Sequence, residues 1–173
     1  MNQDAFIANV QKFTAISAVG VSALRRQGVG IIGRIQEHLG SVDLTALGQS
    51  RIEPDFRGWL DEQTRTLVRA YHVRWGAARK ALNLFLRDCL YNKYLSARYR
   101  LDHLETWMEI PLDSIVTKHL KQDAGWGRLP IWRGLRQLTE TESQRFQNHA
   151  NEMASRQQMA RVHLDVGIWL NNR

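Results

Sequence analysis

The chain contains 173 residues, of which 43% are hydrophobic and 24% charged, a composition typical of a globular protein and not of a disordered one. Its length fits one domain and excludes a second of full size. A formal net charge of +7 makes polyanions, and nucleic acid first, the partners to consider.

Apolar residues at helical spacing predict the first elements, and no run alternates as a half-buried strand would. Gly28 and Gly40 are placed to end the second and third of these helices. The expected helices cover 5–14, 17–27 and 31–39, and 41–43 begins a further short helix. The polar run 22–27 then reads as a surface turn, with an approach to a ligand as the alternative.

A longer helix is expected after Pro54, over residues 56–73, and a break follows near Trp75-Gly76. The next helix covers 78–97, and a shorter one covers 101–108. The first two form a pair joined by a tight turn, so we expect a hairpin element over about 56–97.

Three signals organise the rest of the chain. Pro111 interrupts it and leaves Asp113 as the N-cap of a helix that continues to Leu120. A loop rich in Trp and Gly covers 125–134, and Thr139 and Glu142 form a capping box that starts a helix to about residue 157. With a last helix over 160–170, the prediction is an all-α, single compact domain of about eight to ten helices over 1–173, acting as a monomer.

Cysteine and histidine usage excludes several classes of site. Cys89 is the only cysteine, so an internal disulfide, a zinc finger and a Cys-ligated cluster are ruled out. The six histidines never lie three or four residues apart, which removes helical metal-ligand pairs. We expect neither metal nor cofactor. The longest stretch of low charge, 13–24, is too short to span a membrane, so a cytoplasmic protein without a membrane partner is expected.

Positive charge is concentrated in residues 65–100, where nine residues are basic and only Asp88 is acidic. This pattern fits either a solvated helix face or a surface that binds a polyanion. A tight turn before a helix exposes free N–H groups that suit a phosphate, and Gly76 would let a backbone approach closely, although it could also be a simple helix-breaking turn. The predicted DNA contacts are Arg74, Gly76, Ala77, Arg79 and Arg87.

Three segments, taken in order, resemble the helix-hairpin-helix DNA glycosylase superfamily, and most closely its archaeal 8-oxoguanine glycosylase group. They are Lys80 at the start of the second hairpin helix, Pro111-Leu-Asp113 opening a later helix 33 residues on, and the C-terminal run 162–169. The Gly-x-Gly hairpin of the superfamily is reduced here to Gly76-Ala-Ala-Arg79.

The resemblance implies that Lys80 and Asp113 are catalytic. Cleavage of an N-glycosidic bond develops positive charge on the sugar, which the carboxylate of Asp113 would stabilise. The helix terminus and Arg79 disfavour the ammonium form of Lys80, which activates its amine for Schiff-base chemistry. The implied function is excision of a damaged or modified base, flipped out of DNA, with or without a lyase step.

Several alternatives stay open at this point. The base could be 8-oxoguanine or a hypermodified base of the kind found in phage genomes, and the activity could serve repair or defence against phage. The chain could instead be a non-catalytic helix-hairpin-helix DNA-binding protein, or a helical scaffold whose arginines are solvated. Five tryptophans could stack on a flipped base, and the sequence singles out none of them: Trp75, Trp107, Trp126, Trp132 and Trp169.

Overall fold

The computed structural model describes residues 2–25 and 27–171, and all regular structure in these ranges is helical. The described residues form ten α-helices: α1 (Gln3–Ala18), α2 (Val21–Leu24), α3 (Ile31–Ser41), α4 (Thr45–Gly48), α5 (Glu53–Tyr71), α6 (Trp75–Tyr91), α7 (Lys93–Tyr99), α8 (Ser114–Ala124), α9 (Glu140–Arg156) and α10 (Leu164–Leu170). Two 3-10 helices, η1 (Leu101–Leu104) and η2 (Arg161–His163), complete them. The predicted all-α fold is therefore confirmed. None of the described helices is long and apolar enough to cross a membrane.

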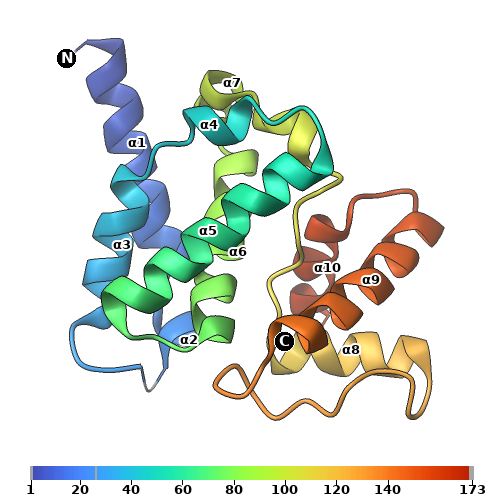
Figure 1. The fold of residues 1–173 in the computed structure, drawn as a ribbon. Helices are drawn as coiled ribbons and strands as arrows, with labels where there is room; N and C mark the ends of the chain where they lie inside the picture. The colour runs from blue at the N-terminus through green and yellow to red at the C-terminus, as the bar shows by residue number, and fades with distance from the viewer. Residues whose placement is uncertain (1, 26, 172–173) are drawn as a thin grey trace.

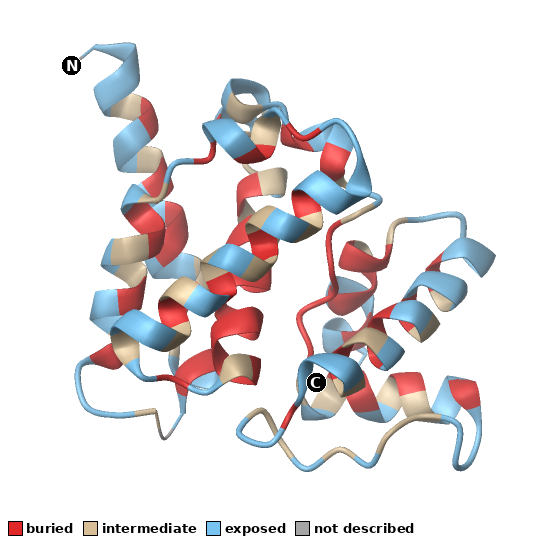
Figure 2. Cartoon of the chain, in the orientation of Figure 1, coloured by how far each residue is buried: buried red, intermediate tan, exposed pale blue. Residues whose placement is uncertain are grey.

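The helices form two lobes, each with its own hydrophobic core (Figure 1). The N-terminal lobe contains α1 to α7 and η1, and the C-terminal lobe contains α8 to α10 and η2. Helix α6 is the centre of the larger lobe, because every residue from Gly76 to Leu86 is buried (Figure 2). A helix covered on all sides in this way carries no solvent-facing stripe from which its orientation could be predicted.

Helix boundaries differ from the sequence prediction at two informative places. Helix α5 ends at His72, which adopts a left-handed conformation with φ of 53°, and α6 already begins at Trp75. Gly76 thus lies inside the first turn of α6 and does not interrupt a helix. The expected helix over 78–97 is divided at Asn92, whose side chain accepts the N–H groups of Tyr94 and Leu95 and caps α7.

Two predicted N-caps are confirmed by hydrogen bonds. The Asp113 side chain accepts the N–H groups of Ile115 and Val116 at the start of α8. Thr139 and Glu142 form both halves of the capping box that opens α9. Other helices are shorter than expected: the segment 17–27 contributes only α2 after the end of α1, and 101–108 contributes only the 3-10 turn η1.

Candidate functional site

The two lobes are joined by the linker, residues 105–113, which runs between η1 and α8. Its central part, residues 108–112, is buried throughout (Figure 2). Because the linker ends at Asp113, whatever fixes the linker also fixes the position of this predicted catalytic carboxylate.

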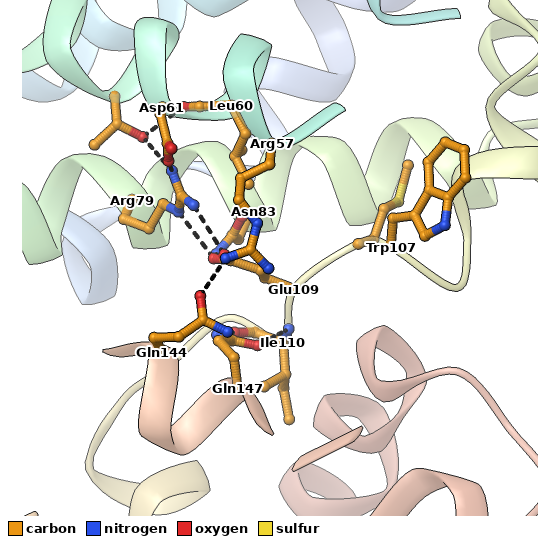
Figure 3. Close-up of polar contacts among 12 residues, drawn as sticks. Arg57, Leu60, Asp61, Arg79, Asn83, Trp107, Glu109, Ile110, Gln144 and Gln147 are labelled. Atoms are coloured by element: carbon orange, nitrogen blue, oxygen red, sulfur yellow. Dashed lines mark hydrogen bonds and ion pairs between the residues drawn. The ribbon is translucent and has the colours of Figure 1, made fainter. Parts of the chain in front are cut away.

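Glu109 fastens the linker to the N-terminal lobe through Arg79 (Figure 3). Two nitrogens of the Arg79 guanidinium each donate to a carboxylate oxygen of Glu109 at 2.8 Å, and Asn83 donates to the same carboxylate at 3.0 Å. The remaining Arg79 nitrogen donates to Asp61 at 2.7 Å and to Thr64 at 3.0 Å. Such a bidentate pair is among the strongest hydrogen-bonded arrangements in proteins, and here it is almost completely shielded from water.

The charges in this network stay ionised despite burial. Burial alone would raise the pKa of Glu109, but the hydrogen bonds and positive charge of Arg79 prevail and hold that pKa below its ordinary value. For Arg79, burial opposes the charged form, and the two carboxylates of Glu109 and Asp61 raise its pKa in spite of that. The linker is therefore held by a buried ion pair, Arg79–Glu109, in which both groups are charged.

The C-terminal lobe holds the other side of the linker through backbone contacts. Gln147 of α9 donates to the carbonyl of Ile110 at 2.9 Å and accepts the N–H group of the same residue at 3.0 Å (Figure 3). Arg161 donates to the carbonyls of Met108 and Trp107 at 2.9 and 2.7 Å. Both lobes thus bind adjacent residues of one short segment, which fixes their relative position.

The structure brings Lys80 and Asp113 together. The ammonium nitrogen of Lys80 lies 3.1 Å from Oδ2 of Asp113, and the Lys80 side chain is only 4% exposed. Nζ also lies 3.5 Å from the carbonyl of Ser22 in α2. Since adjacent helix residues project about 100° apart, Arg79 and Lys80 reach different parts of the linker from neighbouring positions of α6.

Asp113 divides its two carboxylate oxygens between two tasks. Oδ1 accepts the N–H groups of Ile115 and Val116, each at 2.9 Å, while Oδ2 faces Lys80. The cap fixes the rotamer of the side chain, so Oδ2 is held at the site without a flexible torsion. The capping role and the predicted catalytic role are therefore compatible in one residue.

Two cavities meet at this pair of residues. The larger, of about 1080 Å³, is bordered by α2, the turn before α6, the start of α8 and the loop between α8 and α9. The smaller, of about 520 Å³, is bordered by α6, α10 and Pro111. Lys80, Asp113 and Trp169 line both. A ligand could therefore reach the amine and the carboxylate from either side.

Asp165 adds a second carboxylate to the smaller cavity and was not singled out by the sequence. It is buried and forms an ion pair with Arg87, which also pairs with Asp88. Burial raises the pKa of Asp165, and the nearby charge of Asp113 contributes to the rise, whereas Arg87 and Lys80 oppose it. Only its place in the C-terminal run 162–169 could have drawn attention to it.

The predicted DNA contacts fall into two groups. Gly76, Ala77 and Arg79 are buried, and the Arg79 donors are used by Glu109, Asp61 and Thr64. This placement contradicts their prediction as DNA contacts, because a phosphate cannot reach them in this structure. Arg74 is exposed and lines the larger cavity. Arg87 lines the smaller cavity with its charge compensated, so its contact with DNA stays a prediction.

Some residues of the polar run 22–27 and some of the tryptophans also line these cavities. Ser22, Ala23, Arg25 and Gln27 line the larger cavity, while Arg26 lies outside the described residues. Of the five tryptophans, only Trp132 and Trp169 line a cavity described above. No group of three histidine, cysteine, aspartate or glutamate side chains within the described ranges is arranged to hold a metal ion.

Gly76 permits a close approach between protein segments. A Cβ at this position would lie 2.4 Å from the carbonyl oxygen of Leu135 and 2.9 Å from Cβ of Leu138. Gly76→Ala should therefore destabilise the protein, because the loop before α9 must move. Gly58→Ala is the matched control: Gly58 is also helical and a Cβ there meets nothing within 4 Å. The control should gain about 0.5–1 kcal/mol of unfolding free energy in urea titrations. Equal stabilisation by both substitutions would contradict the close contact.

No family model, curated protein or solved structure matches the chain. The features of the molecule that indicate a function are the Lys80–Asp113 pair, the two cavities and the charges around them.

Proposed function

We propose that the protein is a DNA glycosylase that excises a damaged or modified base, with Lys80 as the attacking amine and Asp113 as the carboxylate beside it. The observation that carries the proposal is the 3.1 Å contact between Nζ of Lys80 and Oδ2 of Asp113 at the border of two cavities. A buried amine held against a carboxylate is costly to maintain and unnecessary for DNA binding alone, because a solvated lysine serves that purpose.

The pair supplies the groups that the reaction requires. In this mechanism the Lys80 nitrogen donates its electron pair to C1′ while the bond from C1′ to the base breaks, and the base leaves with the electron pair of that broken bond. Oδ2 of Asp113 is within hydrogen-bonding distance of Nζ and can take a proton from that nitrogen once its bond to C1′ has formed. Its negative charge also stabilises the cationic sugar in the transition state. The leaving base takes up a proton from solvent water, so the step is balanced.

The smaller cavity is suited to a flipped base. Its volume of about 520 Å³ lies in the range of about 300–1,000 Å³ that is usual for small-molecule sites. Trp169 and Asp165 of α10 both line it, so an aromatic ring and a carboxylate paired with Arg87 border the space for the base. An oxidised guanine and a hypermodified pyrimidine are both candidates for the base.

Base release can be measured directly. A panel of duplex and single-stranded oligonucleotides, each with one modified base, is incubated with the protein and scored for abasic sites by strand cleavage in alkali. Abasic sites in at least one member support the glycosylase. Salt-sensitive DNA binding without abasic sites favours a non-catalytic DNA-binding protein. The absence of any DNA binding favours a helical scaffold.

Asp113→Asn tests the role of the carboxylate without removing the cap. Asparagine is as good an N-cap as aspartate, so α8 should form normally, while the negative charge beside Lys80 is lost. Single-turnover base release should fall by about two to three orders of magnitude. The variant should still fold, with a lowered unfolding temperature because the buried Lys80 loses its counter-ion.

The matched control is Asp43→Asn, because Asp43 also accepts a backbone N–H, from Thr45, and is exposed outside both cavities. This variant should excise at the wild-type rate. Wild-type excision by Asp113→Asn would remove Asp113 from the mechanism, and its failure to fold would reduce its role to that of a structural counter-ion for Lys80.

A further inference from the structure

The N-terminus of α6, predicted to bind phosphate, is covered by the chain itself. Residues of the loop before α9 lie against Gly76, with the carbonyl of Leu135 and the side chain of Leu138 in the space that a Cβ would need. A DNA backbone therefore cannot take the position that the turn of a helix-hairpin-helix element would offer. The phosphate contacts must come from another part of the molecule.

The covering loop presents arginines toward solvent. Trp132 and Leu135 pack against the C-terminal core. The rings of Trp132 and Phe146 are arranged edge to face, with 6.1 Å between their centroids. Arg133 and Arg136, which alternate with them, are exposed and line the larger cavity. The inward residues anchor the loop, so the two arginines are presented from a fixed backbone.

Two further arginines line the same cavity from the N-terminal lobe. Arg25 follows α2, and Arg74 precedes α6. The N–H group of Arg74 donates to the side chain of Gln27 at 2.9 Å, which ties the two segments together. The four arginines thus come from three separate segments of the chain and border the cavity that Lys80 and Asp113 also line.

The charge around this cavity is strongly one-sided. Asp113 is the single carboxylate among its described lining residues, and it is already paired with Lys80. Within the described part of the chain, no acidic side chain forms an ion pair with Arg25, Arg74, Arg133 or Arg136. Uncompensated guanidinium groups around a concave surface attract phosphate oxygens, and arginine can hold a phosphate with two hydrogen bonds.

We propose that these four residues, named the arginine groove, bind the phosphates that flank the target nucleotide, and that the loop before α9 replaces the hairpin turn as a phosphate-binding element. The inference rests on the proposed function, because it takes DNA as the ligand. It assigns DNA contacts to Arg133 and Arg136, which the sequence did not identify, and to Arg25, for which the sequence offered an approach to a ligand only as an alternative. Arg79 is left in a structural role.

The experiment measures binding separately from chemistry. An unmodified fluorescent duplex is titrated at several salt concentrations, and the slope of log affinity against log salt is obtained by anisotropy. Each lost phosphate contact reduces this slope by about 0.9. Arg133→Ala/Arg136→Ala should therefore reduce the slope by about 1.8, and Arg25→Ala/Arg74→Ala should act similarly from the other wall.

The control double variant is Arg51→Ala/Arg100→Ala, which removes the same charge from a separate cavity beside α4 and α7. Its slope should stay close to the wild-type value. A thermal melt checks that each variant is folded, as expected for exposed residues.

The outcomes distinguish a failure of the arginine groove as the phosphate-binding site from a failure of the proposed glycosylase activity. The proposal that the arginine groove binds phosphates is wrong if the two groove variants keep the wild-type slope, or if the control variant loses as much slope as they do. This holds even where base release continues. If binding depends on the groove and no base is ever released, the groove stands and the glycosylase fails. If the wild-type protein does not bind the duplex, both are overturned.

Discussion

Lys80→Gln is expected to abolish a covalent adduct that the wild-type protein forms with DNA. The amine that attacks C1′ forms a Schiff base once the sugar ring opens, and borohydride reduces it to a stable protein–DNA bond. Incubation of the protein with an abasic duplex and borohydride should thus give a cross-linked species that migrates slowly in a denaturing gel. Glutamine has no basic amine, so the cross-link should disappear completely.

Lys118→Gln provides the control, because Lys118 is an exposed residue of α8 outside both cavities at the site. Its adduct should form as in the wild type. A different result is expected if Lys80 is only a phosphate contact. No adduct would then form with the wild-type protein, strands would break only after alkali, and Lys80→Gln would weaken affinity and leave the chemistry intact.

Arg79→Ala should destabilise the fold by about 3–5 kcal/mol, because it leaves the Glu109 carboxylate buried without its partner. This is a large share of the total stability of a domain, which is about 5–15 kcal/mol. The control is Arg65→Ala: Arg65 pairs with Glu62 at 3.1 Å on the surface, and such pairs contribute less than about 1 kcal/mol. Urea unfolding gives both values, and equal losses would contradict the structural role of Arg79.

Acid provides a second measurement of the same ion pair. The pKa of Glu109 lies below its ordinary value of 4.5 in the folded protein, so its stabilisation is present above that value and is lost as the pH falls through the folded pKa. Glu109→Gln should be less stable than the wild type at neutral pH and should lose less stability than the wild type on acidification. A parallel pH dependence of both proteins would show that Glu109 does not carry a lowered pKa.

Local signals allowed much of the fold to be predicted. The N-cap at Asp113 and the capping box at Thr139 and Glu142 depend on residues two or three positions apart, so sequence spacing is enough to identify them. Lys80 and Asp113 were paired only by a resemblance, which stays a proposal, and the two side chains meet across 33 residues.

The burial of Arg79 could not be predicted in the same way. Its partners lie 18 and 30 residues away, on α5 and in the linker, and nothing in the sequence beside Arg79 indicates them. Because α6 is covered on every side, its pattern does not distinguish Arg79 from Arg74, which is solvated. The sequence allowed Gly76 either a close backbone approach or a helix-breaking turn. The segment that does approach it is a protein loop distant in the sequence, which local spacing could not indicate.

The attachment of the linker to both lobes has a consequence for how a nucleotide would enter. Rotation of one lobe against the other would have to break the contacts of Glu109 with Arg79 or those of Ile110 with Gln147. A protein built in this way gains little from hinge closure, since its amine and carboxylate are already in place before any substrate arrives. The deformation needed for entry then falls on the DNA, and spontaneous opening of the base pair would set the pace, so that mispaired or unpaired nucleotides would be captured faster than well-paired ones.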